Sequence, residues 1–200
     1  MRVLDTPPDL LFKYLKRDIY ETHLLHGRAR LGPTSLYRSQ FESGAGYADA
    51  DDGVRAARVP ELQKTIRTAN DHFLYCCARS YSYDMHAEWL NRSGCGYDVC
   101  AVMDGPMLID AIARAVKATI GPRLILCGCC KYGCHTNQVG SLKGNLFGDA
   151  FLKPIPYAKE DEYRLAVAFS REDVPEVLDV SSAQIPQAIR QVISLSTPAK

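Results

Sequence analysis

The pattern of apolar and polar residues along this chain predicts short strands more often than helices. Residues 72–80 form a nearly continuous apolar run, with the length of a central strand that is buried on both faces. Other short segments rich in β-branched or aromatic residues are also predicted to be strands: residues 10–15, 28–31, 97–103, 123–129, 163–169 and 176–180. Strands of this number and length predict one central sheet.

Helical spacing is clearest after Asp104, which we expect to be the N-cap residue of a helix with Pro106 in its first turn. Apolar residues then recur on one stripe until Gly121 and Pro122 end the helix. Shorter helices are predicted at residues 17–26, 60–68, 84–90 and 183–195, with Gly27 ending the first and Asp84 capping the third. The pattern predicts an α+β fold with a mixed central sheet and packed helices.

Residues 35–59 lack periodicity and are rich in Gly, Ser, Ala and Asp. We therefore predict a mobile loop within a single domain that covers residues 1–200. Loops of this length in compact domains are usually functional, so this one is a candidate flap over a substrate.

Composition and charge narrow the classes of partner. The chain has 200 residues, of which 46% are hydrophobic and 24% charged, and a formal net charge of +1. A chain with so small a net charge has no broad positive electrostatic field that would attract nucleic acid or an anionic membrane. Binding to either therefore needs a local patch of basic residues. No apolar run approaches the ~18 residues of a membrane span, and Arg2 and Asp5 interrupt the start where a signal peptide is apolar. We expect a cytoplasmic protein that is not attached to a membrane.

Eight cysteines are many for such a chain, and four of them lie between residues 127 and 134. Cys130 and Cys134, followed by His135, could form half of a zinc site, but the paired spacing of a structural zinc ribbon is absent. The competing interpretation is that the cysteines fill apolar positions in strands. We expect no metal site, with a zinc-stabilised interaction protein as an alternative.

The most informative segment runs from Phe151 to Ser170, where charged residues lead directly into an apolar strand. Alternation along that strand places Glu162 and Arg164 on the same face. One interpretation is a solvated ion pair at the rim, which would contribute under ~1 kcal/mol. The other is a functional carboxylate at the entrance to a strand.

Four segments of the chain resemble the bacterial family called domain of unknown function 2971. They are Phe12-Lys13-Tyr14, the turn that begins at Gly32-Pro33, Cys77-Ala78-Arg79-Ser80 followed by Trp89, and Lys153 followed by Glu160-Asp161-Glu162-Tyr163-Arg164-Leu165. The last is the most specific, and the four together span most of the chain. The Asn-Asp-Pro of the family turn is replaced by Arg38-Ser39-Gln40.

The order of these elements also resembles compact ADP-ribosyltransferases. That resemblance implies an NAD-dependent transferase in which Glu162 is the catalytic carboxylate, stabilising the oxocarbenium character that develops when the nicotinamide bond breaks. It also implies a set of NAD-binding residues: Lys13, Tyr14, Arg30, Ser80, Trp89 and Arg164. Arg164 or Arg30 would hold the pyrophosphate, and Tyr14 or Trp89 would stack on a ring.

The acceptor of such a transferase would be a protein or a nucleic acid. A second hypothesis is a binding module without turnover, such as a bacterial or phage defence or anti-defence protein that sequesters a nucleotide or a partner. The altered turn at Arg38-Ser39-Gln40 favours this alternative, because a changed family motif is compatible with a changed activity.

Overall fold

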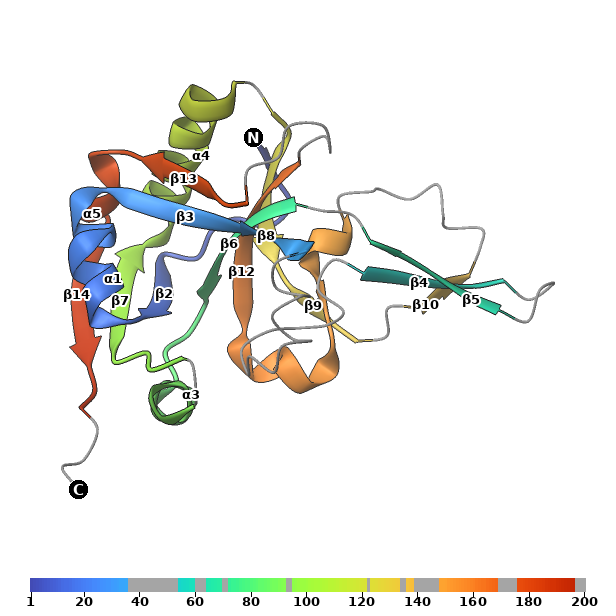
Figure 1. Cartoon of the computed structure of the whole chain (residues 1–200), viewed down its shortest axis with the longest axis horizontal. Coiled ribbons are helices and arrows are strands. Elements are labelled where there is room, and N and C mark those ends of the chain that lie inside the picture. Colours follow the sequence, from blue (N-terminus) through green and yellow to red (C-terminus); the bar gives the residue numbers. More distant parts are fainter. Residues whose placement is uncertain are drawn as a thin grey trace.

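The computed structural model describes residues 1–35, 54–59, 64–69, 72–92, 95–121, 123–133, 136–138, 148–168 and 176–196. Its main feature is a mixed sheet with the strand order β1-β8-β12-β6-β2-β7-β14; β3 is added beside β6, and β13 pairs with β3 (Figure 1). The strands of this sheet are β1 (Arg2–Val3), β2 (Leu10–Leu15), β3 (Arg28–Pro33), β6 (His72–Ala78), β7 (Val99–Asp104), β8 (Ile125–Cys129), β12 (Glu162–Ala168), β13 (Leu178–Ser181) and β14 (Ile189–Ser194). The predicted α+β class with a mixed sheet is confirmed.

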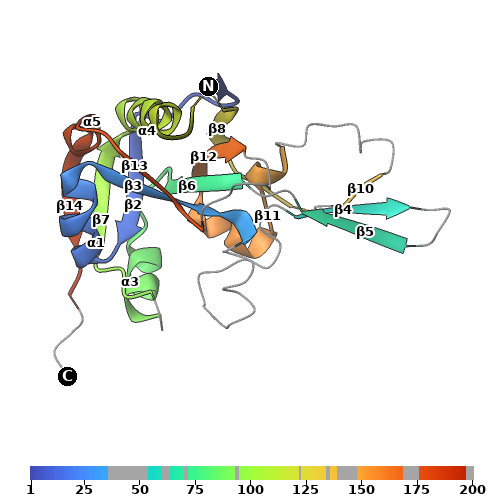
Figure 2. The same ribbon diagram turned by 45° about the horizontal axis from the view of Figure 1, so that its top comes forward.

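Two smaller sheets accompany the main one. Strands β4 (Val54–Val59), β5 (Lys64–Ala69) and β10 (Thr136–Gln138) form a sheet that extends away from the body of the molecule (Figures 1 and 2). Strands β9 (Lys131–Tyr132) and β11 (Leu152–Lys153) pair in parallel. The β9–β11 pair lies next to the start of β12, because Tyr132 of β9 and Lys153 of β11 both contact Glu162.

The helical elements are short except for one. They are α1 (Arg17–Thr22), η1 (Leu24–His26), α3 (Tyr83–Asn91), α4 (Gly105–Ile120), η4 (Gly148–Phe151), η5 (Ile155–Glu160) and α5 (Gln184–Gln187). The α4 N-terminus is capped as predicted, because an Asp104 carboxylate oxygen accepts the Met107 N–H at 2.9 Å. Within the described ranges, no helix combines the length and the apolarity that a membrane crossing requires.

The main hydrophobic core lies on one face of the sheet, against α4. It contains Leu11 and Leu15 of β2, Phe73, Tyr75 and Cys77 of β6, and Tyr163, Leu165 and Val167 of β12, together with the apolar stripe of α4. Alternate residues of the same strands therefore point to the opposite face, where Tyr14, Ala78 and Cys100 pack against α3. The sheet is buried on both sides at this point, which explains the continuous apolar run of β6.

Strand β6 pairs with one strand along one edge and with two strands along the other edge. It pairs with β12 along its whole length, from Glu162↔Ala78 to Ala168↔His72. On the opposite side, β2 contributes a single pair, Phe12↔Ala78, at one end, and β3 contributes two pairs at the other. The sheet therefore forks at β6 into one wing that contains β2 and another that contains β3.

Several predicted elements differ from the structure. The helix predicted at residues 60–68 is wrong, because residues 64–69 form β5, and residues 54–59 of the predicted loop form its partner β4. Lys64-Thr65-Ile66-Arg67-Thr68 contains three β-branched residues, and pairing with β4 outweighs its weak helical pattern. Residues 36–53, the rest of the predicted loop, lie outside the described residues.

The helix predicted at residues 183–195 is also wrong beyond its first turn. It ends at Gln187, and residues 189–194 form β14, which pairs with β7 at the edge of the sheet. At α3 the N-cap is Ser82, whose hydroxyl accepts the Met85 N–H at 3.2 Å, and Asp84 lies in the first turn instead. Pairing with the distant strand β7 thus makes residues 189–194 a strand, and the hydrogen bond of Ser82 makes it the N-cap of α3.

Candidate functional site

The structure places three of the predicted segments on adjacent strands at the same level. Glu162 is the first residue of β12 and is paired with Ala78 of β6, which is paired in turn with Phe12 of β2. Paired residues of neighbouring strands point to the same side of a sheet, so these three side chains share the face covered by α3. The sequence motifs around Phe12, Ser80 and Glu162 are therefore neighbours in the fold.

The Glu162 carboxylate lies inside a cluster of charged groups. Its Oε2 atom accepts hydrogen bonds from Arg164, with Nη2 at 2.9 Å and Nε at 3.2 Å, and from Lys153 Nζ at 3.1 Å. The Cys130 thiol donates to the same oxygen at 3.6 Å. The side chain of Arg164 is 1% exposed and that of Glu162 is 10% exposed, so the cluster is largely removed from water.

Further contacts fix the orientation of this cluster. Lys153 Nζ also donates to the Glu160 carboxylate and lies 4.9 Å from the centre of the Tyr157 ring. Arg164 Nη1 donates to the Ala150 carbonyl at 2.8 Å, which ties η4 to β12. Two carboxylates and two cations thus neutralise one another in the buried network, and β11, η5 and β12 each contribute.

Burial by itself raises the pKa of Glu162, but the charges of Arg164 and Lys153 outweigh it and hold the pKa well below its ordinary value. The Glu160 carboxyl has the opposite balance, because burial raises its pKa more than Lys153 lowers it. Burial also raises the pKa of the Cys130 thiol well above its ordinary value, which keeps it in the S–H form that donates to Glu162. Glu162 is therefore an ionised carboxylate whose charge is already compensated.

This geometry overturns one of the two interpretations of the Glu162–Arg164 pair, the solvated rim pair. The two residues do share one face, as expected, but the pair is buried and not a solvated ion pair at the rim. Arg164, expected to hold a pyrophosphate, instead directs its guanidinium at Glu162 and at a backbone carbonyl. The alternation could be read from the sequence, whereas the enclosure by Lys153 and Cys130 could not.

Ser80 follows β6 and bonds to the neighbour of Glu162, not to Glu162 itself. Its hydroxyl donates to Asp161 Oδ2 at 3.2 Å, and the Asp161 carboxylate also accepts from Arg79 Nε at 2.9 Å. Asp161 adopts a left-handed backbone conformation with φ of 44°, which lets the chain turn sharply from η5 into β12. The Asp161 contacts thus fix the entry to the strand that carries Glu162.

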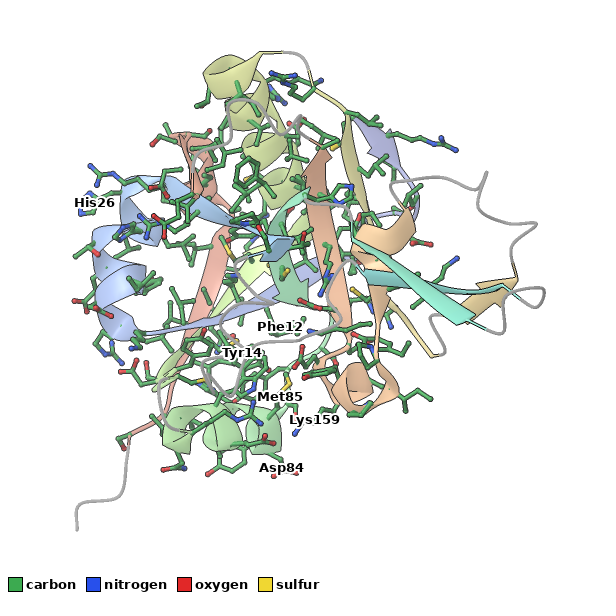
Figure 3. The ribbon with its side chains drawn as sticks, turned by 45° about the vertical axis from the view of Figure 1, so that its right-hand side comes forward. Phe12, Tyr14, His26, Asp84, Met85 and Lys159 are labelled. Atoms are coloured by element: carbon green, nitrogen blue, oxygen red, sulfur yellow. The ribbon has the colours of Figure 1, made fainter. Side chains whose placement is uncertain are left out.

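An aromatic cluster lies beside the network, between β2 and α3, where Phe12, Tyr14 and Met85 come together (Figure 3). The Tyr14 ring contacts Trp89 edge-to-face with a centroid distance of 4.9 Å, and it lies 6.2 Å from Tyr81. The Tyr14 hydroxyl accepts the Ser82 N–H at 3.0 Å. We name the rings of Phe12, Tyr14, Tyr81, His86, Trp89 and Tyr97 the aromatic cluster.

Two of the predicted ligand-binding residues lie elsewhere. Lys13 points to the opposite face of the sheet from Phe12 and Tyr14, and its Nζ atom lies 4.5 Å from the centre of the Tyr75 ring in the main core. Arg30 lies in the wing of β3 and β13, where it forms an exposed bidentate ion pair with Asp179 at 2.8 Å and 2.9 Å. The structure therefore brings Tyr14, Ser80, Trp89, Glu162 and Arg164 to one region and leaves Lys13 and Arg30 outside it.

The cysteines of the zinc interpretation do not form a metal cluster within the described chain. Cys127 is buried in the main core, while Cys130 contacts Glu162 on the other face. Cys134 and His135 lie outside the described residues. No group of three or more potential metal ligands occurs among the residues that the structure describes.

His86 provides a test of the packing in the aromatic cluster. It is fully buried, and burial lowers its pKa below the ordinary value of 6.5, although the charge of Asp98 opposes part of this effect. Below pH 6.5 the unfolded chain therefore binds more protons than the folded chain, and the free energy of unfolding falls as the pH decreases. Between pH 7.5 and pH 5.5, urea unfolding should show a larger loss of stability in the wild type than in His86→Phe. An equal loss in both proteins would contradict the assignment.

Comparisons with family models, with curated proteins and with solved structures each find no match for this chain.

Proposed function

We propose that the chain is a binding module for a nucleotide, which it holds against the aromatic cluster without transferring a group from it. The observation that carries this proposal is that half-buried rings on the face that α3 covers lie close to an exposed cation, Lys159, which is ion-paired with α3. Phe12, Tyr81, Trp89 and Tyr97 are only partly buried, so part of the ring surface is open to stacking. Stacking on aromatic rings is a general way to bind a nucleobase.

Two exposed basic residues lie near the cluster, Arg79 along the chain and Lys159 through its ion pair with α3. Arg79 lies two residues before Tyr81, and its side chain is 42% exposed although it is paired with Asp161. Lys159 is 51% exposed and is paired with Glu88 of α3, one residue before Trp89 (Figure 3). Exposed ion pairs of this kind are weak, and a phosphate group can therefore compete for either cation.

The state of Glu162 favours binding over turnover. An ADP-ribosyl transfer needs a carboxylate that is free to hydrogen-bond a ribose hydroxyl and to stabilise developing positive charge. The charge of Glu162 is already compensated by Arg164 and Lys153 in a buried network. With its charge balanced by two cations, the carboxylate is less able to stabilise positive charge that develops on a ligand.

The proposal predicts that Tyr81→Ala weakens nucleotide binding, because it removes a partly buried ring that contacts Phe12 and Tyr14. The loss of one stacking ring is expected to weaken ADP-ribose binding by roughly 5- to 150-fold in Kd. Tyr83→Ala is the matched control, since Tyr83 lies two residues further on and is 62% exposed. Isothermal titration calorimetry with ADP-ribose and with NAD measures both variants. If neither ligand binds the wild type, or if Tyr81→Ala binds as tightly as the wild type, the proposal is wrong.

The second candidate is the NAD-dependent transferase, acting on a protein or nucleic-acid acceptor. One observation favours it: Phe12, Ala78 and Glu162 lie at the same level on three adjacent strands, and the lowered pKa of Glu162 keeps its carboxylate ionised. Release of nicotinamide from NAD by the purified protein distinguishes the two candidates. Sustained release that disappears in folded Glu162→Gln would favour the transferase, and binding without release would favour the module.

A further inference from the structure

Among the described residues, the fork of the sheet leaves part of one edge of β6 without a paired strand. Beyond the pair Phe12↔Ala78, β2 turns away from β6, and β3 joins β6 only at Leu74 and Phe73. Between these points the Cys76 carbonyl accepts a hydrogen bond from a side chain, Lys13 Nζ at 2.7 Å. An ammonium group thus takes the place that a strand N–H has in a continuous ladder.

No carboxylate of the described residues forms an ion pair with this ammonium group. Lys13 is half-buried, and in the described part of the chain its contacts are the Cys76 carbonyl and the face of the Tyr75 ring. A carbonyl and one ring do not use all three N–H donors of an ammonium group. Lys13 therefore has donors and a positive charge available at the fork.

Next to Lys13 lies a second polar group without a hydrogen-bond partner in the described part of the chain, the hydroxyl of Tyr75. Tyr75 is 3% exposed, and its hydroxyl forms no hydrogen bond with any described residue. Leaving a buried hydroxyl unsatisfied is costly, and such groups in folded proteins usually have a partner that the protein chain alone does not supply. The hydroxyl belongs to the same ring over which the Lys13 ammonium group lies.

We propose that Lys13 and Tyr75 form a binding site for a phosphate group at the fork between β2 and β3. The ammonium group supplies charge and two N–H donors, and the phenol supplies one O–H donor. A phosphate group offers several acceptor oxygens in different directions, so one group can accept from both side chains.

This site is separate from the one proposed for the nucleotide. Lys13 and Tyr75 face the main core, whereas the aromatic cluster and Glu162 lie on the other face of the sheet. The inference therefore does not depend on the proposed function. Each can fail while the other holds.

The experiment measures the binding of inorganic phosphate by isothermal titration calorimetry, with sodium chloride at matched ionic strength as the reference. Lys13→Met keeps the length of the side chain and removes its charge, and Tyr75→Phe removes only the hydroxyl. Loss of a hydrogen bond to a charged group is expected to weaken binding about 10- to 100-fold in each variant. The matched controls are the exposed residues Lys117 and Tyr83, as Lys117→Met and Tyr83→Phe, which should bind phosphate as the wild type does.

Thermal unfolding without phosphate provides a second readout. Because the Tyr75 hydroxyl has no partner to lose, Tyr75→Phe should melt no lower than the wild type. A clearly lower melting temperature would mean that the hydroxyl is bonded within the protein, and the proposal would be wrong. It is equally overturned if the wild type binds no phosphate, or if Lys13→Met and Tyr75→Phe bind it unchanged.

Discussion

Replacing Glu162 by glutamine is expected to lower the free energy of unfolding by about 3–5 kcal/mol at pH 7, because the change leaves two buried cations, Arg164 and Lys153, with only the Glu160 carboxylate of the network. For a chain of this length the melting temperature should fall by roughly 6–20 °C. Urea unfolding followed by circular dichroism measures the effect. A folded variant with wild-type stability would show that the network is not structural.

Glu88→Gln is the matched control for this change. Glu88 also bridges two cations, Arg92 and Lys159, but its side chain is 38% exposed. Water screens such pairs, so the cost should stay below about 1 kcal/mol. A comparable loss of stability in both variants would mean that burial is not the cause.

The difference between wild type and Glu162→Gln should also depend on pH. Since the pKa of Glu162 is lowered in the folded protein, its contribution is fully present above the ordinary value of 4.5 and is lost as the pH falls below it. The gap in stability between the two proteins should therefore be smaller at pH 3.5 than at pH 7. A gap that widens on acidification would contradict the lowered pKa.

Replacing Lys153 by methionine is expected to have an effect of similar size, about 3–5 kcal/mol. The Lys153 side chain is 7% exposed and contacts both Glu160 and Glu162, so its loss leaves two buried carboxylates with Arg164 as their main cation. Protonation of Glu160, whose pKa is already raised, should relieve part of this cost. The Lys153→Met variant should therefore be least stable near neutral pH, relative to the wild type, and recover as the pH decreases toward 5.

Lys159→Met provides the matched control within the same segment. Lys159 is ion-paired as well, with Glu88, but its side chain is 51% exposed. We expect its replacement to cost less than about 1 kcal/mol. If Lys159→Met destabilises the protein as strongly as Lys153→Met, the buried network does not determine the stability of this region.

These predictions concern a network that sequence patterns revealed only in part. Alternation on β12 correctly placed Glu162 and Arg164 on one face. Nothing in the spacing indicated that Lys153 and Cys130 would enclose the carboxylate, because they come from β11 and from the residue after β8. Lys153 belongs to the segment that carries the family resemblance, and this was the one available signal. Cys130 drew attention only as a possible zinc ligand.

The sequence by itself determined the elements whose local pattern agrees with their environment. Continuous apolar character specified β6, and an N-cap, a proline and an apolar stripe specified α4. The tertiary structure alone decided that residues 64–69 and 189–194 are strands, since their hydrogen bonds come from partners distant in the chain. It also decided the environment of Glu162 and the position of Lys13 at the fork. The physical reason is that spacing assigns a side chain to a face of a strand, whereas its burial and its ionic partners depend on which strands pack beside it.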